Sequence, residues 1–158
     1  MLQDYEEIYE GESILRRFPD SRHEVILDRL TQEIASSMQE NPALCLLERR
    51  SLVQLTAGTM VRPDLTLVTQ AGSRPWLVVE VISALDHRAD TVLKKEYYEQ
   101  SKVPRLWMID PRYDNVEVYH SSPYGMVLKK MLSNQEPLSE AGIKGFSVVP
   151  DALFGSSP

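Results

Sequence analysis

The chain has 158 residues, of which 42% are hydrophobic and 25% are charged, and its formal net charge is −6 at pH 7. That length suits one compact domain over residues 1–158. No apolar run approaches the roughly 20 residues that cross a bilayer. We therefore expect a cytoplasmic protein with no membrane partner. The negative charge argues against binding nucleic acid through bulk attraction to phosphates, although it permits a local site where divalent cations meet them.

The N-terminal part of the chain predicts a hairpin and then a helix. The segment before Pro19 predicts a short hairpin around Gly11. From Ser21 onward, apolar residues recur at three- and four-residue spacing, which predicts an amphipathic helix ending at Asn41-Pro42. Ser21 and Glu24 fit the S-x-x-E capping box at the start of this helix. The predicted apolar face consists of Ile26, Leu27, Leu30, Ile34 and Met38.

Three strands are predicted next, over residues 44–55, 60–69 and 76–83. Each run is rich in Leu or Val, and turn-prone segments at residues 57–59 and 71–73 separate them. Such close turns favour an antiparallel meander.

The remaining elements are a helix, a strand and a C-terminal hairpin. Residues 89–102 predict the helix, with Val92, Leu93 and Tyr97 as its apolar stripe, and the following proline stops it. The run RLWMID is a buried strand, NVEVYHSS and GMVLKKMLS form the hairpin, and GFSVVPDALF adds a short strand and one helical turn. Strands with helices against them argue for an α/β or α+β fold built on a central sheet.

Glu80 is an unusual residue for its position, because it lies in the middle of the apolar run LVVEVIS. A buried carboxylate without a partner either costs several kcal/mol or becomes protonated. Asp64 stands at the start of the preceding strand. If the two strands pair, both carboxylates can share one divalent cation such as Mg²⁺, which would keep Glu80 ionised. A partner Arg or Lys, or a position at the sheet edge, would also explain Glu80.

The predicted second helix carries polar residues at helical spacing. Asp90 and Lys94 form an i,i+4 pair, and Tyr98 follows one turn later on the same face. A surface salt bridge between Asp90 and Lys94 is one interpretation of this pattern. We expect Tyr98 and Trp107 to pack in the core rather than to stack on bases.

Three segments in this order, RPDLTLV, LVVEVIS and DTVLKKEYYEQSKVPRLWMIDP, resemble the Uma-type family of restriction-endonuclease-like proteins, within the PD-(D/E)XK nuclease superfamily. The resemblance extends over residues 8–154 and includes YEGE, SRHE and FSVVPDALF. It implies a mixed central sheet flanked by helices, with the C-terminal hairpin as an addition. It also implies hydrolysis of phosphodiester bonds, with Mg²⁺ or Mn²⁺ as cofactor and DNA as the expected substrate.

The resemblance assigns metal ligands and a catalytic lysine. Asp64 matches the Asp of the PD element and Glu80 the acid of the next strand, and the backbone carbonyl of Val81 could add a third ligand. The superfamily places a lysine two residues after this acid, where this chain has Ile82. Families of this kind are thought to take the lysine from the following helix, and Lys94 is the matching residue, with its neighbour Lys95 as a possible substitute.

Two residues of the first helix have open roles. Glu24 matches the region where the superfamily often has an acid that contacts metal-bound water, and the capping box explains it equally well. His23 is either a phosphate contact or a solvated histidine at the helix start. We take Glu24 as a candidate catalytic residue together with Asp64, Glu80 and Lys94.

The resulting hypothesis is a metal-dependent endonuclease, acting as a homodimer so that two sites address two strands. The alternative is a catalytically inactive binding or regulatory module that kept the fold, which Ile82 and the acidic net charge favour. A glycosidase-like carboxylate pair fits less well, because no sugar-stacking aromatic residues lie near the two acids in the sequence.

Overall fold

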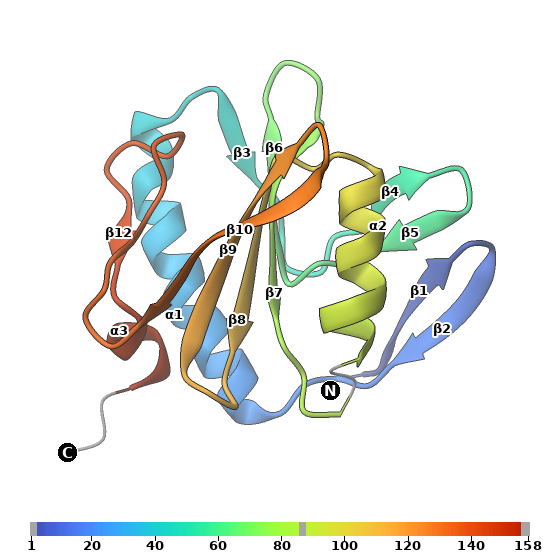
Figure 1. Cartoon of the computed structure of the whole chain (residues 1–158), viewed down its shortest axis with the longest axis horizontal. Coiled ribbons are helices and arrows are strands. Elements are labelled where there is room, and N and C mark those ends of the chain that lie inside the picture. Colours follow the sequence, from blue (N-terminus) through green and yellow to red (C-terminus); the bar gives the residue numbers. More distant parts are fainter. Residues whose placement is uncertain (1–2, 86–87, 156–158) are drawn as a thin grey trace.

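A six-stranded mixed sheet forms the centre of the protein (Figure 1). The computed structural model describes residues 3–85 and 88–155, so the two ends of the predicted domain lie outside the described residues. The strand order is β10-β9-β8-β7-β6-β3, and every neighbouring pair is antiparallel except β7 and β8. The strands are β3 (Leu44–Leu46), β6 (Leu65–Thr69), β7 (Pro75–Val81), β8 (Arg105–Asp110), β9 (Asn115–Ser122) and β10 (Gly125–Ser133).

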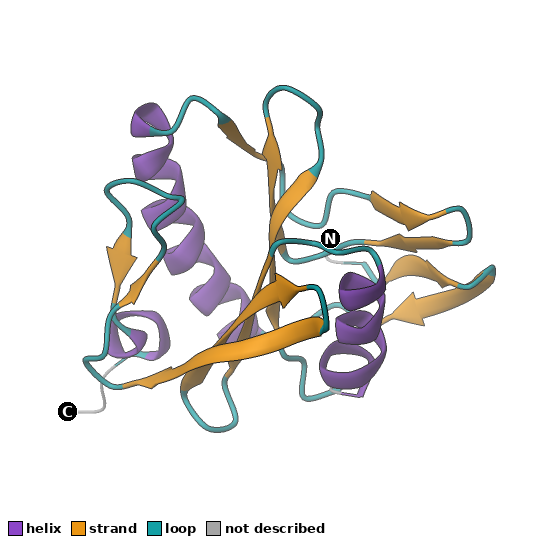
Figure 2. Ribbon diagram, turned by 45° about the horizontal axis from the view of Figure 1, so that its top comes forward, coloured by secondary structure: helices purple, strands orange, loops and turns teal. Residues whose placement is uncertain are grey.

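A second, four-stranded sheet lies on the same side of the central sheet as the helix α2 (Lys95–Gln100), as Figure 2 also shows. It contains the predicted N-terminal hairpin, which turns at Gly11 with a positive φ of 82°. Its strand order is β2-β1-β5-β4. The strands are β1 (Tyr5–Tyr9), β2 (Glu12–Arg16), β4 (Val53–Thr56) and β5 (Thr59–Val61).

Two of the predicted strands are each divided between the two sheets. The run 44–55 forms β3 of the central sheet and β4 of the small sheet, and the polar segment 48–50 connects them. The run 60–69 divides into β5 and β6 around Pro63, which has no N–H to donate to a ladder. The antiparallel meander is therefore confirmed for β3, β6 and β7, which pair in that order, whereas the first two predicted strands are too long.

Helix α1 (Ser21–Ser37) covers the other face of the central sheet (Figure 1). Its predicted apolar face is confirmed, since four of the five residues are buried and the fifth, Met38, is partly buried in the 3₁₀ turn η1 (Met38–Glu40). The C-terminal elements pack beside α1, and Phe146, which precedes the last strand, stacks its ring on Trp107 at 5.5 Å between centroids. They are β11 (Leu138–Ser139), β12 (Ser147–Val148) and α3 (Pro150–Phe154).

The N-cap of α1 is Asp20, not Ser21. The Asp20 side chain accepts a hydrogen bond from the His23 backbone N–H at 2.9 Å, so the predicted capping box is wrong by one residue. Asp20 supplies the side-chain oxygen that an N-cap requires. The Glu24 carboxylate is consequently free of a capping role and interacts elsewhere.

The predicted second helix begins with a π-helical turn, η2 (Ala89–Lys94), and continues as α2. In this geometry Val92 is 47% exposed, so the predicted apolar stripe is wrong at that position. Asp90 and Lys94 are buried instead. A π turn has a wider hydrogen-bonding repeat than an α-helix, which changes the residues that face the sheet, and such turns are frequent at functional sites. Among the described residues, no helix is both long and apolar enough to span a bilayer.

Candidate active site

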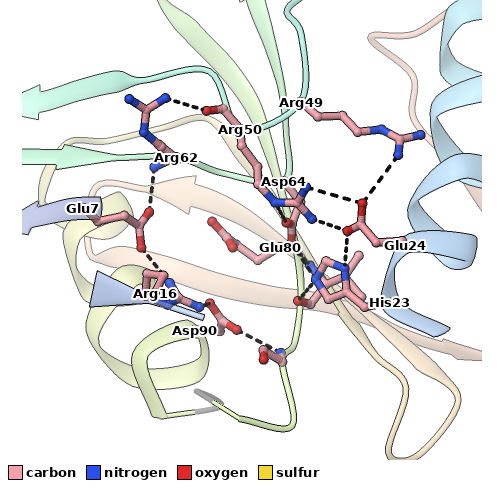
Figure 3. Close-up of polar contacts among 12 residues, drawn as sticks. Glu7, Arg16, His23, Glu24, Arg49, Arg50, Arg62, Asp64, Glu80 and Asp90 are labelled. Carbon is pink, nitrogen blue, oxygen red and sulfur yellow. Dashed lines mark hydrogen bonds and ion pairs between the residues drawn. The ribbon is translucent and has the colours of Figure 1, made fainter. Parts of the chain in front are cut away.

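Asp64 and Glu80 meet at the paired ends of β6 and β7. Leu65 pairs with Val79, so the same register places Asp64 opposite Glu80. Asp64 Oδ2 accepts a hydrogen bond from the Val81 N–H at 2.8 Å. Both side chains are nearly inaccessible to solvent, with 3% and 2% exposure, and they lie in one cluster of polar residues (Figure 3).

Lys94 reaches this cluster from η2, and Lys95 does not. The Lys94 ammonium lies 2.5 Å from Glu80 Oε1 and 2.9 Å from Glu7 Oε2, and the side chain is completely buried. The Lys95 ammonium instead lies 4.4 Å from the centre of the Tyr119 ring. Of the two candidate lysines, only Lys94 is thus in contact with a predicted metal ligand.

The surface salt bridge considered for Asp90 and Lys94 is wrong. Asp90 is buried, and its two carboxylate oxygens accept hydrogen bonds from Arg16 Nη2 at 2.7 Å and from the Ser83 N–H at 3.0 Å. Tyr98 is buried as predicted, but its hydroxyl donates to Glu80 Oε1 at 2.6 Å. Tyr98 is therefore part of the cluster as well as of the core.

Glu7 is the central residue that the sequence analysis missed. It is completely buried on β1. Its Oε1 accepts hydrogen bonds from the Tyr9 hydroxyl and from Arg16 Nη1, both at 2.6 Å, and its Oε2 accepts one from the Arg62 N–H at 2.6 Å. Glu7 also forms an ion pair with the Lys94 ammonium, and this contact links the N-terminal hairpin to the site. The available sequence signal was the strand alternation, which places Glu7 and the buried Tyr9 on one face.

The Glu80 carboxyl holds its proton more tightly than an ordinary glutamate. Burial is the largest cause of its raised pKa, and the nearby carboxylates of Asp64, Asp90 and Glu7 raise it further. Lys94 opposes this effect, and the pKa of Glu80 is nevertheless raised to about 8. Burial of Glu80 thus outweighs the stabilisation that Lys94 gives to its ionised form.

The other two members of the site remain ionised. Burial lowers the pKa of Lys94, but Glu7 and Glu80 outweigh it and hold that pKa well above its ordinary value. Burial raises the pKa of Asp64, but His23 and Arg50 outweigh it, and the pKa of Asp64 is lowered overall.

His23 is a buried member of the site, so the solvated histidine proposed above is wrong. Its Nε2 lies 2.9 Å from the Val81 carbonyl oxygen and 3.3 Å from Asp64 Oδ2, and its Nδ1 lies 3.1 Å from Glu24 Oε1. All three neighbours are acceptors, so both ring nitrogens must carry hydrogen, which requires the imidazolium form. In agreement, burial lowers the pKa of His23 but Asp64 raises it more, and the net shift is upward.

Glu24 interacts with basic residues of the cluster rather than with its acids. Its carboxylate binds the Arg50 guanidinium and the His23 ring, and Arg49 Nη1 lies 3.8 Å from Glu24 Oε2. The side chain is 22% exposed, so it is the most accessible acid of the group.

The oxygen donors of the site suit a hard divalent cation. Within the part of the chain that the structure describes, no three His, Cys, Asp or Glu side chains are grouped to hold a metal ion. The predicted set instead has two carboxylates, Asp64 and Glu80, and one carbonyl, that of Val81. Mg²⁺ binds such oxygens and keeps several waters, so a set this small fits it. A cation bound here would take the place of part of the contacts that Lys94 and His23 make with these groups.

Comparisons with known proteins show the family and the fold of the chain. A family model described as "Uma2: Putative restriction endonuclease" matches residues 2–152. The chain belongs to the Uma2 family. A search of curated proteins gave no match. The crystal structure of "a putative nuclease belonging to DUF820" from Anabaena variabilis ATCC 29413 is similar, with a TM-score of 0.78 and 14% identity over 94% of this chain and 89% of that chain. The predicted family and the restriction-endonuclease-like fold are thus confirmed for this Uma2 protein.

Proposed function

We propose that the protein is a metal-dependent endonuclease that hydrolyses phosphodiester bonds in DNA. The observation that supports this most is the meeting of Asp64, Glu80 and the Lys94 ammonium in one buried cluster. Membership of the Uma2 family supports a nuclease in general. Metal dependence, DNA as substrate and the use of Lys94 are our inferences.

The metal ligands would be Asp64, Glu80 and the carbonyl of Val81. When bound, Mg²⁺ or Mn²⁺ supplies Lewis-acid stabilisation of the phosphate and makes water more acidic. Glu80 must give up its proton to serve as a ligand, since a protonated carboxyl is a poor partner for a cation. Asp64 is already ionised and is held in place by the Val81 N–H.

Lys94 would supply the positive charge that the superfamily takes from a strand lysine. Position 82 holds a buried isoleucine that packs with Val78 in the apolar cluster beneath α2, so no amine reaches the site from there. The Lys94 ammonium reaches Glu80 from η2, and it also contacts Glu7 on β1, which keeps it in position. A fixed ammonium stabilises the charge that develops on phosphate in the transition state and can orient the attacking water.

We infer that substrate approaches the cluster through a cavity that lies beside one of its members, His23. A cavity of 210 Å³ opens beside His23 and Ser83, and Arg22 and Arg112 also line it. Basic side chains at such an opening attract phosphate although the whole chain is acidic. A homodimer would present two such openings to the two strands of a duplex.

The proposal is tested by incubating purified protein with plasmid and with single-stranded DNA in Mg²⁺ or Mn²⁺. We expect cleavage by the wild type, loss of cleavage in Asp64→Ala and Glu80→Ala, and loss of Mn²⁺ binding by calorimetry in the same variants. Gel filtration over a range of concentrations tests the homodimer. Intact substrates together with absence of metal binding by the wild type would refute the nuclease.

A non-catalytic binding module is the second candidate, and one observation favours it. Lys94, Arg16 and Arg50 already form ion pairs with the buried acids, so the cluster is stabilised without a metal ion. Calorimetry distinguishes the two functions, since this module would bind no Mn²⁺ in either the wild type or Glu80→Ala.

A further inference from the structure

Arg50 is a second basic side chain inside the candidate site, and it enters from the loop between β3 and β4. Its guanidinium is bound to Glu24, and its Nε lies 3.4 Å from Asp64 Oδ1 (Figure 3). The side chain is 12% exposed, so it lies between the buried acids and solvent. Its guanidinium carbon also lies 4.9 Å from the centre of the Phe18 ring and 5.9 Å from that of Tyr5. These contacts fix the planar group at the edge of the cluster.

The backbone at Arg50 is held in a conformation that is unfavourable for an arginine. Its φ is +55°, in the left-handed region that favours glycine. The Arg62 guanidinium stabilises this turn by donating to the Arg50 carbonyl oxygen at 3.0 Å, and the Ser51 N–H donates to the Glu48 carbonyl at 3.2 Å. Backbone strain of this kind is found at functional sites, where the surrounding structure maintains it. The turn therefore serves to direct the Arg50 side chain inward.

Arg50 also has a hydrogen-bond donor that is not used. Its Nε is buried and, among the described residues, makes no hydrogen bond, although it lies within ion-pair distance of Asp64 Oδ1, at 3.4 Å. A buried donor without a partner costs about 1–3 kcal/mol. The donor is adjacent to a proposed metal ligand, which is where a phosphate oxygen would lie. An acceptor supplied by a ligand would remove this cost.

Resting on the function proposed above, we propose that Arg50 is a catalytic residue that binds the non-bridging oxygens of the scissile phosphate. Guanidinium matches two phosphate oxygens with two parallel hydrogen bonds, and Glu24 is the counter-ion that holds it until substrate arrives.

In hydrolysis the oxygen of water bonds to phosphorus and the bond to one sugar oxygen breaks. The two protons of the water end on the leaving sugar oxygen and on the new phosphate monoester. Arg50 stabilises the negative charge that increases on the non-bridging oxygens.

Kinetics of three variants test this role. Arg50→Ala is expected to lower kcat by about 10²–10³-fold, the usual loss when one preorganised donor is removed. Arg50→Lys keeps the charge without the planar fork and should recover only part of the rate. Added methylguanidinium should restore activity to Arg50→Ala, which a purely structural role does not allow. Arg74→Ala is the control, because Arg74 is exposed in the turn between β6 and β7, at the other end of these strands from Asp64 and Glu80. Its kcat should stay within about threefold of the wild type, as surface substitutions have small effects.

Binding of DNA distinguishes failure of this inference from failure of the nuclease. Fluorescence anisotropy of a labelled single-stranded oligonucleotide in Ca²⁺ should show about tenfold weaker binding by Arg50→Ala than by the wild type, the effect of one lost charge-assisted contact. Equal affinities, or equal losses in Arg74→Ala and Arg50→Ala, would overturn the role of Arg50 even if the wild type cleaves DNA. Absence of cleavage by the wild type would overturn the nuclease, and the binding comparison would still decide whether Arg50 contacts the DNA backbone.

Discussion

Lys94 and Lys95 are neighbours in the chain with different surroundings, and this difference gives a matched pair of variants. Lys94 contacts two buried carboxylates, whereas Lys95 lies over the Tyr119 ring. We expect Lys94→Met to lower the rate of DNA cleavage by about 10²–10³-fold, the range for loss of one fixed electrostatic group. Lys95→Met should retain the wild-type rate. If Lys95→Met is the inactive variant, the assignment of the lysine is wrong.

The same substitution should destabilise the protein. Lys94→Met leaves Glu7 and Glu80 buried without their shared cation, and breaking a buried pair in this way costs about 3–5 kcal/mol. Urea unfolding followed by circular dichroism measures this loss. A cleavage assay of Lys94→Met is meaningful only at temperatures where that experiment shows the variant to be folded.

Glu80 predicts a pH dependence of stability in the metal-free protein. Its pKa is raised from 4.5 to about 8, so between these values the folded protein keeps a proton that the unfolded chain has lost. The free energy of unfolding should therefore fall as pH rises from 4.5 to 8. Glu80→Gln cannot ionise, and its stability should fall less over this range. Parallel curves for the two proteins in urea titrations would show that Glu80 has an ordinary pKa.

At the scale of elements, the start of α1 provides a test of the corrected cap. Asp20→Ala removes the side chain that accepts the His23 N–H, and we expect a loss of about 1 kcal/mol in the free energy of unfolding. Ser21→Ala is the matched control at the next position and should change stability by only a few tenths of a kcal/mol, as expected for a residue outside the cap. A larger loss in Ser21→Ala would support the capping box that the sequence suggested.

The elements that could be predicted are those fixed by local pattern. Asp64 and Glu80 could be brought together from the sequence, because their strands are joined by a short turn and pair directly. The apolar spacing of α1 and the C-terminal hairpin were predictable for the same reason. Hydrophobic period and turn chemistry decide such features without reference to distant parts of the chain.

The elements that could not be predicted depend on distant partners. Arg16 and Asp90 are 74 residues apart in the sequence, and no local pattern indicates that they form a buried ion pair. The division of the run 44–55 between two sheets and the π turn of η2 are also consequences of packing. The alternative of a surface salt bridge between Asp90 and Lys94 is wrong because both side chains are buried, and Asp90 pairs with the distant Arg16 instead.

At the scale of the whole molecule, metal binding should stabilise the fold. A ligand that binds only the folded state stabilises it by about 2.7 kcal/mol at 100 times its Kd. We therefore expect Mn²⁺ to raise the melting temperature of the wild type in differential scanning fluorimetry. Asp64→Ala and Glu80→Ala should show no such shift. A shift of equal size in all three proteins would place the metal elsewhere.

The most direct test of the account is anomalous diffraction from a crystal soaked in Mn²⁺. We predict one anomalous peak in contact with the carboxylates of residues 64 and 80, with the amine of residue 94 next to it. An amine still bound between Glu7 and Glu80, with no peak beside the two acids, would contradict the proposal that this cluster is a metal centre.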